Sequence, residues 1–280
     1  MNPFFNGPNN DTRRDRIRRR ATDKSSCTIS CLSLERAVIC RVEAFRRDLK
    51  HLVCLEAGDN FCTTIITERE RQLMPFYKDH VYPHLVAILG NPKPVQTIRQ
   101  QLVPLAHGRV LEIGVGPGVN FVHYDPEKVS KVYALEPNPG MMPRAERQGR
   151  RTQLDIEFLD LPGERIPLAD ASVDTVVSTF TLCTIPGVVE AIRGIGRVVK
   201  PGGQFLFFEH GLAPDARVQR WQKRTEPLFK WAFEGCHVTR DITSLIKAGG
   251  FKIEQMGAAY LAPFPKSGSY LYWGVARPKV

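Results

Sequence analysis

The sequence predicts a doubly wound α/β fold built on a mostly parallel, seven-stranded sheet. Three observations support this fold class: short apolar runs of strand length recur from residue 105 onward, segments with helical spacing separate them, and a glycine-rich turn follows the first run. The length fits as well, because 280 residues can bury one large core and leave room for an extension.

Each element is predicted from its own local pattern. The glycine pairs Gly202-Gly203 and Gly249-Gly250 mark the ends of two helices. We expect strands at 109–113, 131–135, 154–159, 173–178, 203–209, 251–259 and 269–277. We expect helices at 118–124, 139–148, 187–198 and 239–248, with a further segment around 215–233.

The first quarter of the chain has a different composition. It is rich in arginine, and five of the seven cysteines precede Met74. We interpret residues 1–73 as a disordered or non-native N-terminal extension, with Met74 as the true start. Residues 74–104 would form an N-terminal helical cap, and residues 105–280 the domain that carries the motifs. Within the extension, a weak helical pattern over 32–57 predicts one amphipathic helix.

Composition narrows the class of protein. No apolar run approaches the roughly 20 residues of a membrane span, and the N-terminus lacks the apolar core of a signal peptide. The net charge of +10 suits an acidic partner or an anionic membrane surface. Cys27 and Cys31 have a spacing that zinc sites use, but no second close Cys/His pair follows, so we predict no metal site. We expect a cytoplasmic protein, with peripheral membrane contact as an option.

The most informative stretch is the turn that begins at Glu112 and contains Gly114, Gly116 and Gly118. Glycines at alternate positions let the backbone bend sharply and leave no Cβ between it and a ligand. The spacing differs from that of dinucleotide binders, and a plain tight turn is the alternative. The next strand, however, ends at Glu136, where nucleotide-binding α/β units place a carboxylate that accepts from ribose hydroxyls.

The motifs together resemble the methyltransferase type 11 group of S-adenosylmethionine (SAM)-dependent enzymes. The segments that carry this resemblance are 112–121, 135–139, 168–177, 181–186 and 197–203. Within the group, three further segments resemble the branch of animal alkyl-thiol methyltransferases: 181–183, 208–210 and 235–240. The resemblance covers residues 74–280 and implies a Rossmann-like class I methyltransferase sheet that ends in a β-hairpin, with SAM as the cofactor.

Two departures from that family matter. The animal relatives carry an apolar N-terminal membrane anchor, which we do not find in this chain, so membrane residence does not follow from the resemblance. Pro162 stands where family members more often have a small or acidic residue next to the adenine. Because proline has no N–H to donate, the adenine contacts stay open, and Asp160 and Glu164 are both candidates for receiving the adenine amino group.

The resemblance also assigns the cofactor-binding residues. Glu112 would face the methionine ammonium, directly or through water, while Glu136 accepts from the ribose. Thr179 ends the fourth strand next to the methyl group. The complete predicted set is Glu112, Gly114, Gly116, Gly118, Glu136, Pro137, Asp160, Glu164 and Thr179.

Two histidines are the candidate catalytic residues. His210 at the end of the fifth strand and His237 could orient or deprotonate the acceptor, with a structural hydrogen bond as the alternative for each. A thiol acceptor needs no strong base, because at neutral pH it is already a few per cent thiolate. We interpret Cys183 and Cys236 as small packing residues, since direct transfer needs no covalent intermediate.

The sequence therefore predicts methyl transfer from SAM to a small lipophilic nucleophile, such as a thiol, by in-line displacement. The alternative acceptors are a quinone precursor and a phospholipid head group. Two further hypotheses are a nucleic-acid methyltransferase and a non-catalytic SAM-binding protein. The first lacks a legible RNA-binding module, and the second should have lost the cofactor motifs, which this chain retains. The segment with Trp221, Phe229, Trp231 and Phe233 is the candidate for a lid over an apolar acceptor, with a membrane interface or ordinary packing of an amphipathic helix as the alternatives. The oligomeric state is not predicted.

Overall fold

The computed structural model describes residues 28–34, 37–43, 52–54, 77–89, 91–261 and 265–279. The chain separates into two compact units, residues 1–73 and residues 74–280. Each unit contains its own β-sheet, one of three strands and one of seven.

The first unit contains a small antiparallel sheet. Its strands are β1 (Thr28–Leu34), β2 (Ala37–Glu43) and β3 (Leu52–Cys54), with β2 in the middle. The prediction of one amphipathic helix over 32–57 is therefore wrong. The β-branched Val38, Ile39 and Val42 explain the difference, because such side chains fit a pleated strand better than a helix. The interpretation of residues 1–73 as an extension stays a prediction, since most of them lie outside the described residues.

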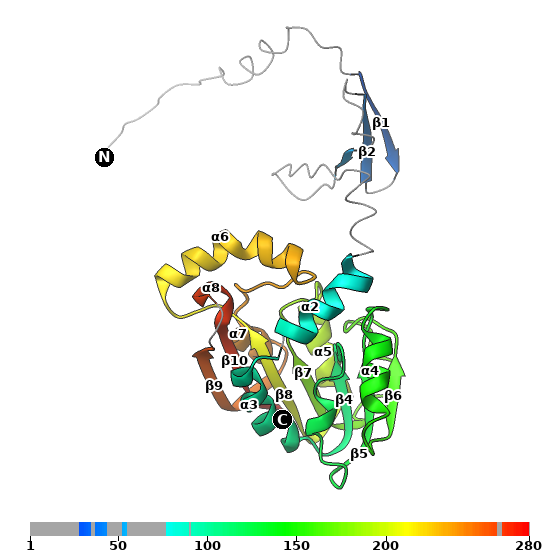
Figure 1. Cartoon of the computed structure of the whole chain (residues 1–280), viewed down its shortest axis with the longest axis vertical. Helices are drawn as coiled ribbons and strands as arrows, with labels where there is room; N and C mark the ends of the chain where they lie inside the picture. The colour runs from blue at the N-terminus through cyan, green and yellow to red at the C-terminus, as the bar shows by residue number, and fades with distance from the viewer. Residues whose placement is uncertain are drawn as a thin grey trace, which may run out of the picture. The chain divides into compact units, whose positions relative to one another are not determined.

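The second unit is built on a seven-stranded sheet in the order β6-β5-β4-β7-β8-β10-β9 (Figure 1). The first five strands of this order run parallel, and β10 pairs antiparallel with both β8 and β9. The strands are β4 (Gly108–Ile113), β5 (Val129–Leu135), β6 (Ile156–Leu159), β7 (Val173–Thr179), β8 (Val199–His210), β9 (Phe251–Tyr260) and β10 (Tyr270–Pro278). The predicted fold class is confirmed, including the closing hairpin.

Helices cover both faces of this sheet. They are α2 (Tyr82–Leu89), α3 (Lys93–Leu102), α4 (Met142–Gly149), α5 (Val188–Val198), α6 (Ala216–Ala232), α7 (Ile242–Ala248) and α8 (Lys266–Ser269). A π-helical turn, η1 (Tyr77–Val81), precedes α2, and two 3₁₀ turns are η2 (Val103–Leu105) and η3 (Phe121–His123). The predicted helix at 118–124 is only the turn η3, and the side chains of Asn120 and Tyr124 on either side of it donate to Glu112.

The alternation of side chains along the strands divides the core into two layers. Leu111 and Ile113 of β4 pack with α5 and α7, whereas Val110 packs with α3 on the opposite face. This period of two is what a strand buried on both faces requires. Glu112 falls on the α3 face, where it is completely buried. A charged residue at such a position needs polar partners, and these form part of the site.

The strand order places the ligand-binding region. From β4 the chain first proceeds through β5 to β6 and then returns to β7 on the other side of β4. In open α/β sheets, ligands bind outside the carboxyl ends of the strands at such a reversal. The glycine-rich turn after β4 lies at this point. Among the described residues, no helix is long and apolar enough to cross a membrane.

Candidate active site

A cavity of about 500 Å³ lies at the carboxyl ends of the central strands. Gly114 after β4, Glu136 after β5, Thr179 at the end of β7 and His210 at the end of β8 all line it. This size is typical of small-molecule sites. The remaining lining is mostly apolar; most of it comes from the loops that follow β4, β5, β6 and β7, and α2, α3, the end of α6, α8 and the start of β10 complete it.

The three glycines of the turn have different structural roles. Gly114 and Gly116 have φ of +68° and +56°, in the left-handed region that favours glycine. A Cβ on Gly114 would lie 2.2 Å from the Thr181 hydroxyl, so this glycine lets the turn pack against the end of β7. A Cβ on Gly116 would meet nothing within 4 Å, because that position faces open space in the cavity. Gly118 does not line the cavity and packs against Phe121 and Ala145.

Glu136 is buried beside the glycine turn. Its Oε2 accepts from the Gly116 N–H at 2.7 Å, and its Oε1 accepts from the Asn138 N–H at 2.9 Å. Burial raises the pKa of Glu136 to about 7, although both hydrogen bonds oppose that shift. Pro137 and Asn138 line the cavity next to it, and the Asn138 side chain donates to Glu234 beyond the end of α6. The structure thus joins the turn after β5 to the segment that follows α6.

Glu112 does not reach the cavity directly. It is fully buried, and its carboxylate accepts from the Asn120 amide and the Tyr124 hydroxyl, each at 2.7 Å. Burial raises the pKa of Glu112 to about 7. The Asn120 amide also donates to the Thr179 hydroxyl at 3.1 Å, and Thr179 lines the cavity. Glu112 therefore supports the cavity wall through its neighbours.

Arg99 is a site residue that the sequence analysis missed. It lies on α3, is 3 % exposed, and lines the cavity. One nitrogen, Nη1, donates to Asn120 and, at 3.1 Å, to Thr179, while the Nε atom is buried and has no hydrogen-bond acceptor among the described residues. Burial lowers the pKa of Arg99 to about 10, so the group keeps its charge at neutral pH. A buried cation with an unused donor is suited to an anionic ligand group.

The structure separates the two candidates for the adenine contact. Glu164 lines the cavity beside Pro162 and Gly163, and its Oε1 accepts from the Gly187 N–H at 3.0 Å. Asp160 is exposed and does not line the cavity. Of this pair, therefore, only Glu164 stands in the wall of the candidate site.

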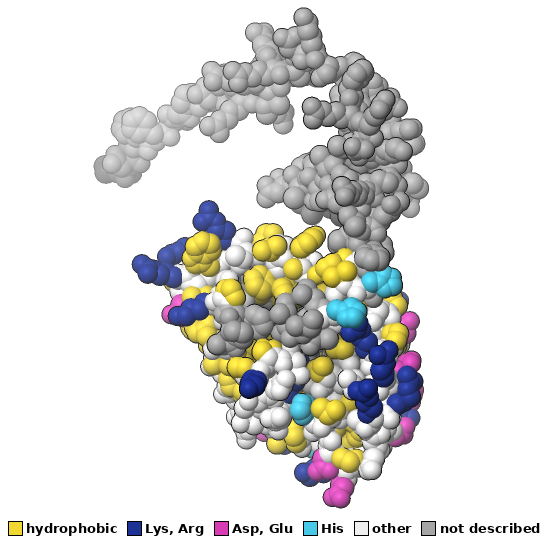
Figure 2. Space-filling model, viewed as in Figure 1, with side chains coloured by type: hydrophobic (Ala, Val, Ile, Leu, Met, Phe, Trp, Pro, Cys, Tyr) yellow, Lys and Arg dark blue, Asp and Glu magenta, His cyan; other side chains and the backbone are white. Residues whose placement is uncertain are grey.

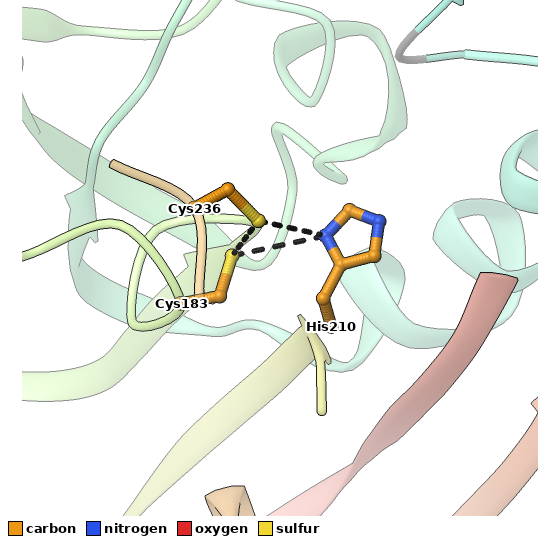
Figure 3. A group of neighbouring side chains, drawn as sticks. All are labelled: Cys183, His210 and Cys236. Carbon is orange, nitrogen blue, oxygen red and sulfur yellow. Dashed lines mark hydrogen bonds between the residues drawn. The ribbon is translucent and has the colours of Figure 1, made fainter. Parts of the chain in front are cut away.

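Another part of the cavity wall contains His210, Cys183 and Cys236, which point toward one another (Figure 3). His210 Nδ1 lies 3.8 Å from Cys183 Sγ and 3.7 Å from Cys236 Sγ, and the two sulfurs are 3.6 Å apart. Contact with the Cys183 thiol holds the pKa of Cys236 well below its usual range. Burial lowers the pKa of His210, but the nearby Cys236 outweighs this effect and raises it. The two shifts have opposite signs: the Cys236 thiol has a lowered pKa and the His210 imidazole has a raised pKa.

Glu209 holds the turn that carries Cys183. Its carboxylate is fully buried and accepts from the Ser178 hydroxyl and from the backbone N–H groups of Thr181 and Cys183. The charged hydrogen bonds from this one side chain fix the backbone immediately after β7. The position of the Cys183 sulfur therefore follows from the fold.

Two predicted residues lie away from the cavity. His237 does not line it; its ring contacts Glu226, with Nδ1 3.4 Å from Oε1. Trp221 is 59 % exposed on the outer face of α6, so the hypothesis that it forms a lid is wrong. The aromatic residues from this region that line the cavity are Phe229 and Phe233.

Comparison with known proteins agrees with the geometry. The family described as "Methyltransferase domain" matches residues 111–207. Thiol S-methyltransferase TMT1B of Homo sapiens is 32 % identical over 190 residues, which cover 62 % of this chain and 77 % of that protein. Its Rattus norvegicus counterpart is 34 % identical over 152 residues, covering 52 % of this chain and 61 % of the rat protein, less than two thirds of its length.

More distant proteins share smaller parts of the chain or the fold alone. The ubiquinone/menaquinone biosynthesis C-methyltransferase UbiE of Bartonella tribocorum is 29 % identical over 109 residues, covering 38 % of this chain and 42 % of UbiE. The crystal structure of the [4+2]-cyclase SpnF superposes with a TM-score of 0.57 at 16 % identity, covering 75 % of this chain and 96 % of SpnF.

The fold and the glycine-rich cavity define a class I SAM-dependent methyltransferase, with SAM as the methyl donor. Within that class, the chain belongs to the methyltransferase family that contains the thiol S-methyltransferases.

Proposed function

We propose that this enzyme transfers the methyl group of SAM to the sulfur of a small, apolar thiol by direct in-line displacement. The observation that carries the proposal is one cavity with two unlike ends. One end has the glycine turn, Glu136 and Arg99. The other has His210 with two cysteines, surrounded by Phe180, Phe229 and Phe233.

The first end fits the cofactor. The open space at Gly116 admits a ligand close to the backbone, and Glu136 can accept hydrogen bonds from the ribose hydroxyls. The Arg99 guanidinium, which lines the cavity, would face the methionine carboxylate, with Thr179 beside it. Pro162 and Glu164 would contact the adenine. The cofactor end of the cavity would be shaped or supported by Gly114, Gly118, Glu112 and Pro137. Asp160 would lie outside it.

The second end suits a thiol. The cofactor supplies the reactive methyl carbon, so the protein contributes mainly position and the exclusion of water. A thiol is partly ionised at neutral pH and needs little help to become a nucleophile. His210 can receive or hold a proton near the acceptor sulfur, whereas His237 does not line the cavity and contacts Glu226. The aromatic walls favour an apolar substituent on that thiol.

A quinone precursor is the second candidate acceptor. The similarity to UbiE, a quinone-biosynthesis C-methyltransferase, favours it. Carbon methylation of a ring requires proton removal at the ring, and His210 is one group in the described cavity wall that could perform it. The quinone hypothesis therefore requires a base such as His210, whereas an ionised thiol does not.

The outer face of α6 would contact an anionic membrane surface, from which an apolar acceptor could be drawn. Arg217, Trp221, Arg224, Leu228 and Trp231 recur at helical spacing on this face. Trp221, Leu228 and Trp231 are each about three fifths exposed, and hydrophobic and basic side chains gather over α6 (Figure 2). This pattern is typical of helices that lie at a membrane interface. Co-sedimentation with phosphatidylserine vesicles, lost in Trp221→Ala/Trp231→Ala, would support the contact; equal sedimentation would exclude it.

The deciding experiment supplies the purified chain with radiolabelled-methyl SAM and separate acceptors. These are an alkyl thiol, a demethylated quinone, phosphatidylethanolamine and total RNA. We expect label on the thiol alone. Label on the quinone or the lipid would mean that this molecule, and not a thiol, is the acceptor, while the assigned cofactor site would stand. Label on RNA, or binding of SAM without transfer to any acceptor, would contradict the proposal.

A further inference from the structure

The cluster of Cys183, His210 and Cys236 has the dimensions of a metal site. The three residues come from different parts of the fold: the turn after β7, the end of β8 and the segment after α6. Their potential ligand atoms nevertheless lie within 4.8 Å of one another and face the same point (Figure 3). Two thiols and one imidazole form a soft donor set, which suits Zn²⁺ rather than Mg²⁺ or Ca²⁺.

The distances agree with tetrahedral zinc. With Zn–S near 2.3 Å and Zn–N near 2.0–2.1 Å, tetrahedral geometry places two sulfurs roughly 3.8 Å apart and a sulfur and a nitrogen roughly 3.5 Å apart. The structure has 3.6 Å between the sulfurs, and 3.7 and 3.8 Å from His210 Nδ1 to them. A disulfide would require a distance of about 2.05 Å between the two sulfur atoms. The cluster can therefore hold the ion with shifts of a few tenths of an ångström.

The surroundings fix the positions of the three ligands. Glu209 holds the Cys183 backbone, and the His237 N–H donates to the Cys183 carbonyl at 2.7 Å, which ties the two cysteine segments together. The His210 ring packs at 4.8 Å from the Phe180 ring. All three ligands line the cavity that also contains the glycine turn. Zinc sites with three protein ligands and a fourth position open to a cavity are typical of catalysis.

We propose that Cys183, His210 and Cys236 bind a Zn²⁺ ion whose fourth ligand is the sulfur of the methyl acceptor. The identity of this fourth ligand rests on the proposed function, whereas the zinc site itself does not. The sequence analysis predicted no metal site because it compared only cysteines that are close in sequence. His210 is 27 residues from Cys183 and 26 residues from Cys236.

The chemical step balances without an oxidant or reductant. The thiol R–SH replaces a water on zinc and releases its proton to solvent, which leaves a zinc-bound thiolate. A sulfur lone pair then forms the new bond to the methyl carbon, while the bond from that carbon to the SAM sulfur breaks. Its electron pair stays on S-adenosylhomocysteine. The product thioether is neutral and a weaker ligand, so water displaces it.

The first test measures the zinc content of the full chain, purified under reducing conditions without chelator. We expect Cys183→Ser, Cys236→Ser and His210→Gln each to contain about one equivalent less zinc than the wild type, because a site with two protein ligands binds the ion far more weakly. His237→Gln is the matched control and should keep the full content. Zinc content equal to the wild type in all three ligand variants would overturn the proposal.

The second test separates the metal site from the acceptor and does not require a variant to fold. Wild-type protein in which Co²⁺ replaces zinc should absorb with thiolate-to-cobalt charge-transfer bands and tetrahedral d–d bands. Adding a six-carbon alkyl thiol should change these bands, and the matching alcohol should not. Tetrahedral bands that do not change when the thiol is added would refute the proposal that the acceptor sulfur is the fourth ligand. They would still support the zinc site. Octahedral cobalt would refute the site itself.

Discussion

Arg99 gives the sharpest test of how the cofactor end works. Arg99→Met keeps an apolar stem and removes the guanidinium, whose buried Nε has no acceptor among the described residues. A hydrogen bond to a charged group contributes about 1.5–3 kcal/mol, and about 1.4 kcal/mol corresponds to a tenfold change in affinity. If the guanidinium donates to the methionine carboxylate, S-adenosylhomocysteine should bind the variant roughly 10- to 150-fold more weakly.

Calorimetry with two ligands isolates this interaction. 5′-Methylthioadenosine shares the adenosine and the sulfur of S-adenosylhomocysteine but lacks the amino-acid portion. Its Kd should not change in Arg99→Met, which would also show that the glycine turn remains folded. Arg99→Lys should fall between wild type and Arg99→Met, because lysine keeps the charge and loses the planar donor geometry.

Two results would refute this reasoning. Equal losses for both ligands would mean that Arg99 acts only by holding Asn120 and Thr179, to which its Nη1 donates. Unchanged affinity for S-adenosylhomocysteine would mean that the carboxylate binds elsewhere.

Three further predictions concern the glycine turn, the buried carboxyl group and the acceptor wall. Gly116→Ala should destabilise the protein by about 1–2 kcal/mol through its positive φ and weaken SAM binding in calorimetry. Gly202→Ala, also at positive φ but outside the cavity wall, should be destabilised in the same way but should bind SAM as the wild type does. Equal SAM affinity in the two variants would contradict the role of Gly116 in binding the cofactor. Burial raises the pKa of Glu112 to about 7, so its protonated form is favoured in the folded state and stability should fall as pH rises from about 4.5 to 7, by on the order of 3 kcal/mol. Urea unfolding at pH 5 and pH 8 measures this loss of stability, and Glu112→Gln should remove it. The same change in unfolding free energy between these pH values in the wild type and in Glu112→Gln would contradict the prediction. Phe229→Ala should raise KM for an apolar thiol roughly tenfold with SAM affinity unchanged. Trp221→Ala, on the exposed face of α6, should change neither KM nor SAM affinity. A higher KM in Trp221→Ala with an unchanged KM in Phe229→Ala would restore the lid hypothesis for Trp221.

Local patterns predicted the part of the site that is continuous in sequence. Gly114, Gly116 and Glu136 follow directly from two strands and the turns after them, so the fold class brings them together. The positions of these residues depend on neighbours within about twenty residues. Local signals are sufficient there.

The rest of the site depends on contacts between distant segments. Arg99 stands on the buried stripe of α3 beside Val95, Ile98 and Leu102, and a charge at such a position was the available signal. The orientation of α6 was not predictable from its aromatic content. Gln222 faces inward and hydrogen-bonds three backbone groups, which turns Trp221 outward.

The central claim is methyl transfer to a thiol sulfur, and a matched pair of acceptors tests it most directly. Deuteromethyl SAM is supplied to the purified chain with a six-carbon alkyl thiol, its alcohol isostere and a demethylated quinone in one reaction, analysed by mass spectrometry. We predict one deuteromethyl thioether for each S-adenosylhomocysteine formed. The alcohol should react at least about a hundredfold more slowly, because it is not ionised at neutral pH. Methylated quinone or ether as the main product would contradict the account.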